Sequence, residues 1–366
     1  MKVTKVLVVD DSALMRRTLG QILRDAGMEV EMARNGVEAV DRLVQYHPDV
    51  VTLDVNMPEM DGLTSLSLMM QVRPTPVVMV SSLTEKGAMA TLEALALGAV
   101  DCIAKPGGTI SLNIEQVALE LVTKVRAAAQ AKPRAGARQR LAGQRRQESR
   151  GPCVRNAGSV ATEAVGATRA TAGEYQGLVL MGVSTGGPRT LEDILPHLPA
   201  HCPWPVLLAQ HMPANFTQVL ARRMDGLCAV HVCEVDRPTR LAPGHVYVAR
   251  GGTDMVVARA SGGELVARPV PESCAYAWHP SVSRLVESAM QVVDPSQLIG
   301  VLLTGMGDDG AQPMAELRRR GGRTVAESRE TAVVYGMPQE LVARNGATVQ
   351  LPCDRIASQL CQWLGV

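Results

Sequence analysis

The chain has 366 residues, 46% of them hydrophobic, so we expect two domains joined by a connector rather than one core. A formal net charge of +1 gives no global field that would recruit nucleic acid or a membrane surface. The eight cysteines form no C-x-x-C pair and no apolar run approaches the ~20 residues of a membrane span, which predicts a cytoplasmic protein with free thiols and no membrane insertion.

Short apolar runs alternate with helical patterns between residues 5 and 129. The expected strands are 6–9, 30–33, 50–55, 77–80 and 101–104. The expected helices are 13–26, 36–46, 61–71, 87–97 and 112–129. Five βα units of this length predict an α/β fold with a doubly wound parallel sheet, in which ligands bind at the carboxyl ends of the strands.

Charged and hydroxyl residues stand at the ends of these strands. Asp10 and Asp11 follow the first strand, and Asp54 ends the third. Three carboxylates at one sheet edge repel each other unless a hard cation such as Mg²⁺ lies among them. Ser82 follows the fourth strand and Lys105 the fifth, where they would complete an anion site opposite the metal. A lone aspartate would indicate only a solvated loop charge, but this joint placement favours a phosphoryl site.

Three motifs in this segment resemble those of response-regulator receiver domains, which have a flavodoxin-like fold. They are Val-Val-Asp-Asp-Ser (8–12), Leu-Asp-Val-Asn-Met-Pro-Glu-Met-Asp-Gly (53–62) and Ala-Lys-Pro (104–106). The resemblance implies that Asp54 is the phosphoacceptor and that Mg²⁺ is held by Asp10, Asp11, Asp54 and the backbone carbonyl of Asn56. It also implies that Ser82 and Lys105 contact the phosphoryl group.

The sequence departs from the receiver pattern at Cys102, where many receivers carry an aromatic residue three positions before the lysine. The usual aromatic rotamer switch is therefore expected to be altered or absent.

A connector rich in Ala, Gly, Arg, Gln and Thr follows, without a strand or helix period. Its first half is basic, which fits a tether to nucleic acid or an acidic partner, but a solvated flexible linker is favoured because no aromatic residues interleave the arginines. We expect a receiver domain over 1–126, a linker over 127–174 and a catalytic domain over 175–366.

A second α/β pattern begins after the connector and predicts another doubly wound, mostly parallel sheet. The expected strands are 178–182, 206–210, 229–234, 246–249, 255–258, 298–304 and 323–325. The expected helices are 188–195, 214–224, 280–292, 311–320 and 338–343. Turn residues at 242–244 and at 262–263 predict that a hairpin-like antiparallel section interrupts the parallel sheet.

The first strand of this half ends in the sequence Gly-Val-Ser-Thr-Gly-Gly-Pro at 182–188. A glycine-flanked serine between a buried strand and a helix can present a hydroxyl nucleophile, with the helix N–H groups facing an oxyanion. Taken alone, Ser184 fits a glycine-rich or anion-binding turn equally well.

Two further strand ends carry residues that could activate Ser184. His211 follows one strand, and Asp308 and Asp309 follow another. An imidazole can accept the serine proton, and a carboxylate can fix its tautomer. His279 is a rival base, although it precedes a helix, and the spacing does not choose between the two aspartates. The order Ser, His, Asp differs from the Ser, Asp, His order of α/β-hydrolases.

Five separated motifs resemble the chemotaxis protein-glutamate methylesterases of the CheB family. They are Val-Ser-Thr-Gly-Gly-Pro (183–188), Gln-His-Met-Pro (210–213), His-Pro-Ser-Val (279–282), Leu-Thr-Gly-Met-Gly-Asp-Asp-Gly (303–310) and Tyr-Gly-Met-Pro (335–338). The resemblance implies that Ser184 is the nucleophile, His211 the general base and then acid, and Asp309 the orienting acid. It places Thr185 and the backbone of Met306 near the oxyanion and the imidazole.

The same resemblance implies a phosphorylation-controlled hydrolase that removes methyl esters from glutamates of chemoreceptor cytoplasmic domains, releases methanol and also deamidates receptor glutamines. It implies a chemotaxis histidine kinase as phosphodonor, Mg²⁺ in the receiver alone and no cofactor for hydrolysis. An unphosphorylated receiver would pack over the catalytic face. Two alternatives remain open at this point, namely a response regulator with a nucleic-acid-binding output and a hydrolase of small esters or thioesters. The absence of a helix-turn-helix pattern disfavours the first.

Overall fold

The computed structural model describes residues 3–82, 84–105, 114–131 and 176–366, and side chains from 117 onward in the third range. Most of the expected linker lies outside the described residues. Among the described residues, no helix is both long and apolar enough to cross a membrane.

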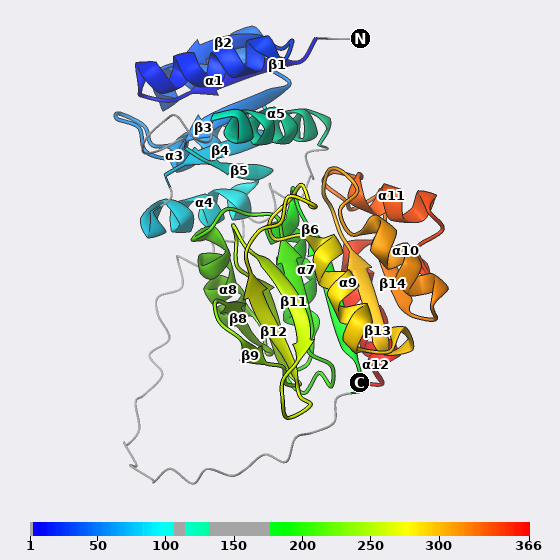
Figure 1. The fold of residues 1–366 in the computed structure, drawn as a ribbon. Helices are drawn as coiled ribbons and strands as arrows, with labels where there is room; N and C mark the ends of the chain where they lie inside the picture. The colour runs from blue at the N-terminus through cyan, green and yellow to red at the C-terminus, as the bar shows by residue number, and fades with distance from the viewer. Residues whose placement is uncertain (1–2, 83, 106–113, 132–175) are drawn as a thin grey trace, which may run out of the picture.

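The N-terminal domain is a five-stranded parallel sheet, as the sequence predicts, and its strand order is β2-β1-β3-β4-β5 (Figure 1). The strands are β1 (Lys5–Val9), β2 (Glu29–Ala33), β3 (Val50–Asp54), β4 (Val77–Ser81) and β5 (Asp101–Ala104). The helices are α1 (Ala13–Asp25), α2 (Gly36–Tyr46), α3 (Gly62–Val72), α4 (Glu85–Leu97) and α5 (Ile114–Gln130). Side-chain caps explain where helices begin: Ser12, Asn35 and Asp61 each accept a hydrogen bond from a backbone N–H of the first turn.

The C-terminal domain is built on a seven-stranded parallel sheet with strand order β15-β14-β13-β6-β7-β10-β8. The strands are β6 (Leu178–Val183), β7 (Val206–Gln210), β8 (His231–Val235), β10 (His245–Ala249), β13 (Leu298–Leu302), β14 (Arg323–Glu327) and β15 (Val349–Leu351). The helices are α7 (Gly187–Ile194), α8 (Phe216–Leu227), α9 (Val282–Val292), α10 (Ala311–Arg319), α11 (Met337–Ala343) and α12 (Cys353–Leu364), with short 3₁₀ turns η1 (Leu195–His197) and η2 (Pro295–Gln297).

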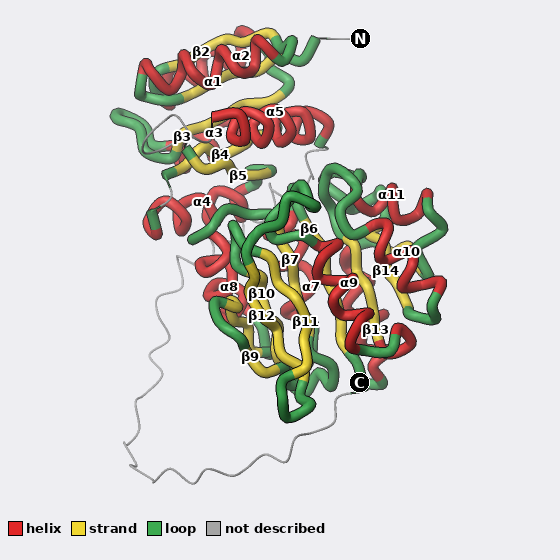
Figure 2. The backbone as a smooth tube through the Cα atoms, in the orientation of Figure 1, coloured by secondary structure: helices red, strands yellow, loops and turns green. Residues whose placement is uncertain are grey.

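The antiparallel section does not interrupt the parallel sheet, so that expectation was wrong. It forms a separate three-stranded sheet of β11 (Asp254–Arg259), β12 (Leu265–Val270) and β9 (Thr239–Arg240) (Figure 2). Its hairpin turns at Gly263, whose φ of 88° suits glycine. Alternating apolar residues of β11 and β12 pack on one face of the large sheet, so this hairpin acts as a cover layer rather than as part of the sheet.

Hydrophobic residues fill both faces of the seven-stranded sheet. One core joins alternate residues of β6, β7 and β13 to α7, α8 and α12, and the other joins the remaining strand residues to α9, α10 and α11. The first core continues into the N-terminal domain, because α4 packs against α7 and α8. The two domains therefore meet at the carboxyl edge of the large sheet (Figure 1).

Candidate active site

The order of the large sheet places a topological switch point at β6. The chain passes from β6 to β7 on one side and returns later to β13 on the other, so a crevice opens at the carboxyl ends of β6 and β13. Ser184 follows β6 and His211 follows β7. Because Val183 pairs with Gln210 in register, Ser184 lies beside His211 across the two strand ends. The N–H of Ser184 donates to the carbonyl of Thr304 at 2.9 Å, which ties the serine to the segment that follows β13.

His211 and Asp309 form a buried pair in this crevice. Nε2 of His211 lies 2.8 Å from Oδ2 of Asp309, and the two side chains are 3% and 8% exposed. Among the described residues, Nδ1 of His211 is buried without a hydrogen-bond partner. If Nε2 donates to the carboxylate, Nδ1 is the nitrogen with a free lone pair. The ring is therefore oriented to accept a proton through Nδ1.

The start of α9 supplies the other partners of Asp309. Its carboxylate accepts hydrogen bonds from the N–H of Val282 at 2.8 Å, the N–H of Ser283 at 2.9 Å and the hydroxyl of Ser281 at 3.2 Å. Burial alone would raise the pKa of Asp309, but the bonds from His211 and Ser283 outweigh it and lower that pKa to about 2. Asp309 is thus an anion held at a helix N-terminus.

The alternative acid Asp308 and the alternative base His279 form ion pairs with other residues. The Asp308 side chain is 71% exposed and lies 3.3 Å from the guanidinium of Arg344. The rival base His279 uses Nδ1 to contact Asp254 at 3.0 Å, and Asp254 also accepts from Arg284 at 2.7 Å. Of these residues, only Asp309 contacts His211.

Two glycines allow the chain to pack closely around Ser184, because a Cβ at either position would clash. A Cβ on Gly305 would lie 2.6 Å from Cβ of Ser184, and a Cβ on Gly187 would collide with the Gln210 side chain. Gln210 itself donates to the carbonyl of Ser184 at 3.0 Å. The glycine-rich sequences on both loops are therefore required by close approach and not only by turn geometry.

The expected supporting residues behave differently from each other. Met306 lines the cavity beside His211. The hydroxyl of Thr185 instead donates to Oδ2 of Asp101 in the N-terminal domain at 2.5 Å. The carbonyl of Thr185 accepts from the Thr304 hydroxyl at 2.8 Å. In this state the Thr185 side chain is engaged by the other domain.

A cavity of about 550 Å³ lies between α5 and the catalytic edge. From the C-terminal domain it is lined by His211, Met212, Trp278, His279 and Met306, among others. From α5 it is lined by Val117, Leu119, Glu120, Thr123 and Lys124. The N-terminal domain thus forms one wall of the space through which a substrate would reach His211.

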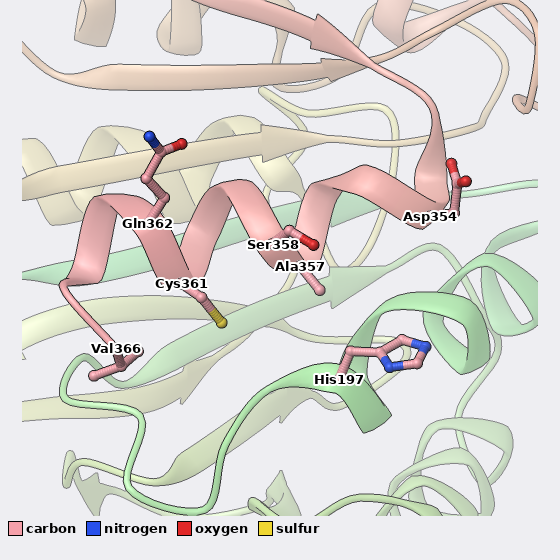
Figure 3. Close-up of a pocket in the computed structure, with 7 residues that line it drawn as sticks. All are labelled: His197, Asp354, Ala357, Ser358, Cys361, Gln362 and Val366. Atoms are coloured by element: carbon pink, nitrogen blue, oxygen red, sulfur yellow. The ribbon is translucent and has the colours of Figure 1, made fainter.

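A second cavity, of about 560 Å³, also has a serine, a histidine and an aspartate in its wall (Figure 3). Ser358 and Asp354 come from α12 and His197 from η1. No hydrogen bond joins these three among the residues that the structure describes. This cavity offers no activated hydroxyl, unlike the crevice beside β6.

The acidic cluster of the N-terminal domain assembles as the sequence predicts. Carboxylate oxygens of Asp10, Asp11 and Asp54 lie within 4.8 Å of one another, and Asp10 and Asp54 are buried. Lys105 Nζ lies 2.9 Å from Asp10 and 2.7 Å from Asp54. Burial raises the pKa of Asp54; the pKa of Lys105 is also raised, because its bonds to both carboxylates outweigh burial. A set of hard oxygen donors such as this is typical of a Mg²⁺ site.

Of the other two residues expected at this pocket, Asn56 contacts Asp54, whereas the Ser82 hydroxyl contacts Thr84. The hydroxyl of Ser82 is 3.1 Å from that of Thr84. The N–H of Asn56 donates to Oδ1 of Asp54 at 3.3 Å.

Several residues of the site were not predicted from the sequence. Ser281 could be predicted as a helix N-cap, which it is for α9, but the sequence spacing does not indicate that its hydroxyl also contacts Asp309. Asp101 is predicted only as the first residue of a strand, and no sequence pattern around it indicates a contact with Thr185. Trp278 likewise shows no pattern that would place it on His211.

The structure places a five-stranded parallel α/β domain with an acidic cluster in front of a second α/β domain, whose crevice brings together a serine, a histidine and an aspartate. The family model for CheB methylesterase matches residues 179–360, and the model for the response regulator receiver domain matches residues 6–114. The chain is 53% identical to protein-glutamate methylesterase/protein-glutamine glutaminase 3 of Rhodospirillum rubrum over 99% of this chain and 96% of that protein. It is 51% identical to protein-glutamate methylesterase/protein-glutamine glutaminase 2 of Rhodopseudomonas palustris over 98% of both chains.

Among solved structures, the CheB methylesterase catalytic domain of Thermotoga maritima is 34% identical, with a TM-score of 0.49, and the match covers 51% of this chain and 98% of that domain. The family models and the full-length relatives show that the chain belongs to the CheB family of protein-glutamate methylesterase/protein-glutamine glutaminases, with a receiver domain in front. The resemblance inferred from the motifs is confirmed.

Proposed function

We propose that this chain hydrolyses the γ-methyl esters of glutamates in the cytoplasmic domains of chemoreceptors, releasing methanol, and deamidates receptor glutamines at the same site. This activity would serve adaptation in chemotaxis and would take place in the cytoplasm. The names of the full-length relatives support the reaction class. The observation that carries the proposal is the buried 2.8 Å pair of His211 and Asp309 beside Ser184.

In the proposed mechanism, Ser184 is the nucleophile. Nδ1 of His211 takes the serine proton as the hydroxyl oxygen attacks the ester carbonyl, and Asp309 stabilises the imidazolium. The tetrahedral intermediate collapses when His211 returns the proton to the methoxide, which leaves as methanol. Water then attacks the acyl-enzyme with His211 again as base, and free glutamate and Ser184 are restored. With glutamine, the leaving group is ammonia.

The oxyanion would be held by backbone N–H groups around the start of α7 and by the backbone of Met306. Thr185 would complete this site once its hydroxyl is released from Asp101. Donors fixed in place before reaction favour the charge that develops in the transition state.

In the receiver, Asp54 would accept a phosphoryl group from a chemotaxis histidine kinase. Mg²⁺ held by Asp10, Asp11, Asp54 and the backbone carbonyl of Asn56 would offset the charge of the incoming phosphoryl oxygens. Lys105 lies within 2.7 Å of Asp54 and would pair with the phosphoryl group, with Ser82 as a second contact. We assign the receiver to 1–126, the linker to 127–174 and the catalytic domain to 175–366, except that α5 runs to Gln130 and its buried last turn belongs with the receiver.

The docked arrangement suggests how the receiver would control the reaction. α5 walls the cavity that holds His211, and Asp101 holds the Thr185 hydroxyl. A receptor helix could not enter while these contacts persist. Phosphorylation of Asp54 would weaken the docking and open the cavity.

Methanol release from methylated receptor tests the catalytic assignment. We expect Ser184→Ala to lose the activity and His211→Gln to fall by at least 10³-fold. Ser358→Ala is the matched control, because Ser358 lines the other cavity beside a histidine and an aspartate, and it should keep the wild-type rate. Full activity in Ser184→Ala would overturn the assignment.

A further inference from the structure

An indole ring covers one face of the His211 imidazole. The ring centroids of His211 and Trp278 are 5.2 Å apart and their planes differ by 12°, so the rings are stacked. Trp278 belongs to the loop before α9 and lines the cavity beside His211. The start of α9 also donates to Asp309, so one segment holds the carboxylate that contacts the imidazole edge and carries the indole that contacts the imidazole face.

In the part of the chain that the structure describes, the charged side chains near the imidazole do not contact the ring face that the indole covers. Asp309 contacts the Nε2 edge. The other titratable residues that line the same cavity are Glu120, Lys124, Glu272 and His279. Lys124 pairs with Glu120 and Asp101, and His279 pairs with Asp254. Among the described residues, no anion other than Asp309 contacts the ring.

The stack favours the charged form of the imidazole. An aromatic face attracts a cation, and indole does so more strongly than the rings of phenylalanine and tyrosine. In the proposed mechanism His211 becomes an imidazolium only after it takes the serine proton, so this attraction is greatest in the intermediate and adjacent transition states. The indole also limits tilting of the ring, which fixes the plane in which Nδ1, buried without a hydrogen-bond partner among the described residues, accepts a proton.

We propose that Trp278 is a positioning residue for catalysis, which fixes the plane of His211 and stabilises its imidazolium. The proposal rests on the proposed function of Ser184 and His211 and adds a residue to it.

Kinetics of the full-length protein with a phosphodonor test the proposal. We expect Trp278→Leu to lower kcat about 10-fold, with KM within about 2-fold, because the lost interaction acts on the charged state. The acid limb of the pH–rate profile should move to lower pH, since an imidazolium without the indole loses its proton more readily. Trp278→Phe should show a smaller change in kcat and a smaller shift of the acid limb. The control is Trp363→Leu, whose ring lies over Arg323 away from the cavity and which should leave the profile unchanged.

A second measurement does not depend on activity. A protonated imidazole in contact with an indole quenches the fluorescence of the indole. The emission of Trp278, measured as the difference between the wild type and Trp278→Phe, should therefore depend on pH. That dependence should disappear in His211→Gln. This readout remains available if the leucine variant does not fold.

The outcomes separate this proposal from the function on which it rests. An unchanged acid limb in Trp278→Leu, or a raised KM with unchanged kcat, would overturn the role of Trp278 while the esterase assignment stands. Wild-type protein that releases no methanol but shows the pH-dependent quenching would contradict the proposed function and retain the His211–Trp278 interaction.

Discussion

The hydroxyl of Thr185 donates a 2.5 Å hydrogen bond to the carboxylate of Asp101, and both side chains are buried at the junction of the two domains. Thr185 follows the proposed nucleophile, whereas Asp101 begins the last strand of the receiver. The next residue, Gly186, donates its N–H to the carbonyl of Val100 at 3.0 Å. The receiver therefore contacts the loop after Ser184 directly, and its helix α5 also lines one side of the cavity beside His211.

Asp101→Asn should raise the basal esterase rate. A buried hydrogen bond to a charged acceptor contributes about 1 kcal/mol more than one to a neutral acceptor, so the docked state should weaken about 5-fold. We expect methanol release without phosphodonor to rise several-fold, while the stimulated rate stays near that of the wild type.

The matched control for Asp101→Asn is Arg222→Ala. Arg222 and Glu85 also pair across the domains at 2.6 Å, but their side chains are 62% and 63% exposed. Solvent screens such a pair, so the basal rate should change less than about 2-fold. A basal rate unaltered by Asp101→Asn would contradict the direct hold on the loop.

Asp309→Asn should lower kcat by about 10⁴-fold, because the amide cannot fix the required tautomer of His211 or stabilise its cation. Asp308→Asn should remain within about 2-fold, because Asp308 is exposed and contacts Arg344. Steady-state methanol release by both variants measures the difference. The reverse ranking would show that the orienting acid is misassigned.

Asp309 should also make stability depend on pH. Its folded pKa of about 2 is below the unfolded value of about 3.9, so its contribution is full above pH 4 and is lost as the pH falls towards 2. The difference corresponds to about 2–3 kcal/mol in the free energy of unfolding. Urea unfolding between pH 5 and pH 2 should show a steeper loss for the wild type than for Asp309→Asn; parallel curves would contradict the low pKa.

Lys124→Met should destabilise the receiver. Lys124 is 3% exposed, and its ammonium lies 3.3 Å from Asp101, 3.0 Å from Glu120 and 2.7 Å from the carbonyl of Cys102. Removing the ammonium leaves the buried carboxylate of Asp101 without its cationic partner, at a cost of about 3–5 kcal/mol.

Urea unfolding measures this loss, with Lys5→Met as the control. Lys5 pairs with Glu29 at 3.6 Å on the surface, so its removal should change stability by less than about 1 kcal/mol. Equal effects of the two variants would show that the buried ammonium has no special role.

The sequence predicts the elements whose patterns are local. Apolar runs located the central strands, and strand ends located Ser184, His211 and the acidic cluster. Besides the two short 3₁₀ turns, four elements escaped prediction: β9 has two residues, β12 contains Pro269, β15 has three residues, and α12 follows a segment without a strong start signal.

Contacts between distant segments were also not predictable. Spacing could not separate Asp308 from Asp309, because the choice depends on where the start of α9 lies. The hydrogen bond from Thr185 to Asp101 and the stacking of Trp278 on His211 join residues that no local pattern relates.

The most direct test of a receiver-gated serine esterase is the rate of methanol release from methylated receptor, with and without a phosphodonor, for the wild type and Asp54→Ala. Stimulation of the wild type is expected, together with an Asp54→Ala variant that keeps the basal rate and does not respond. Equal stimulation of the two proteins would contradict control of Ser184 through Asp54.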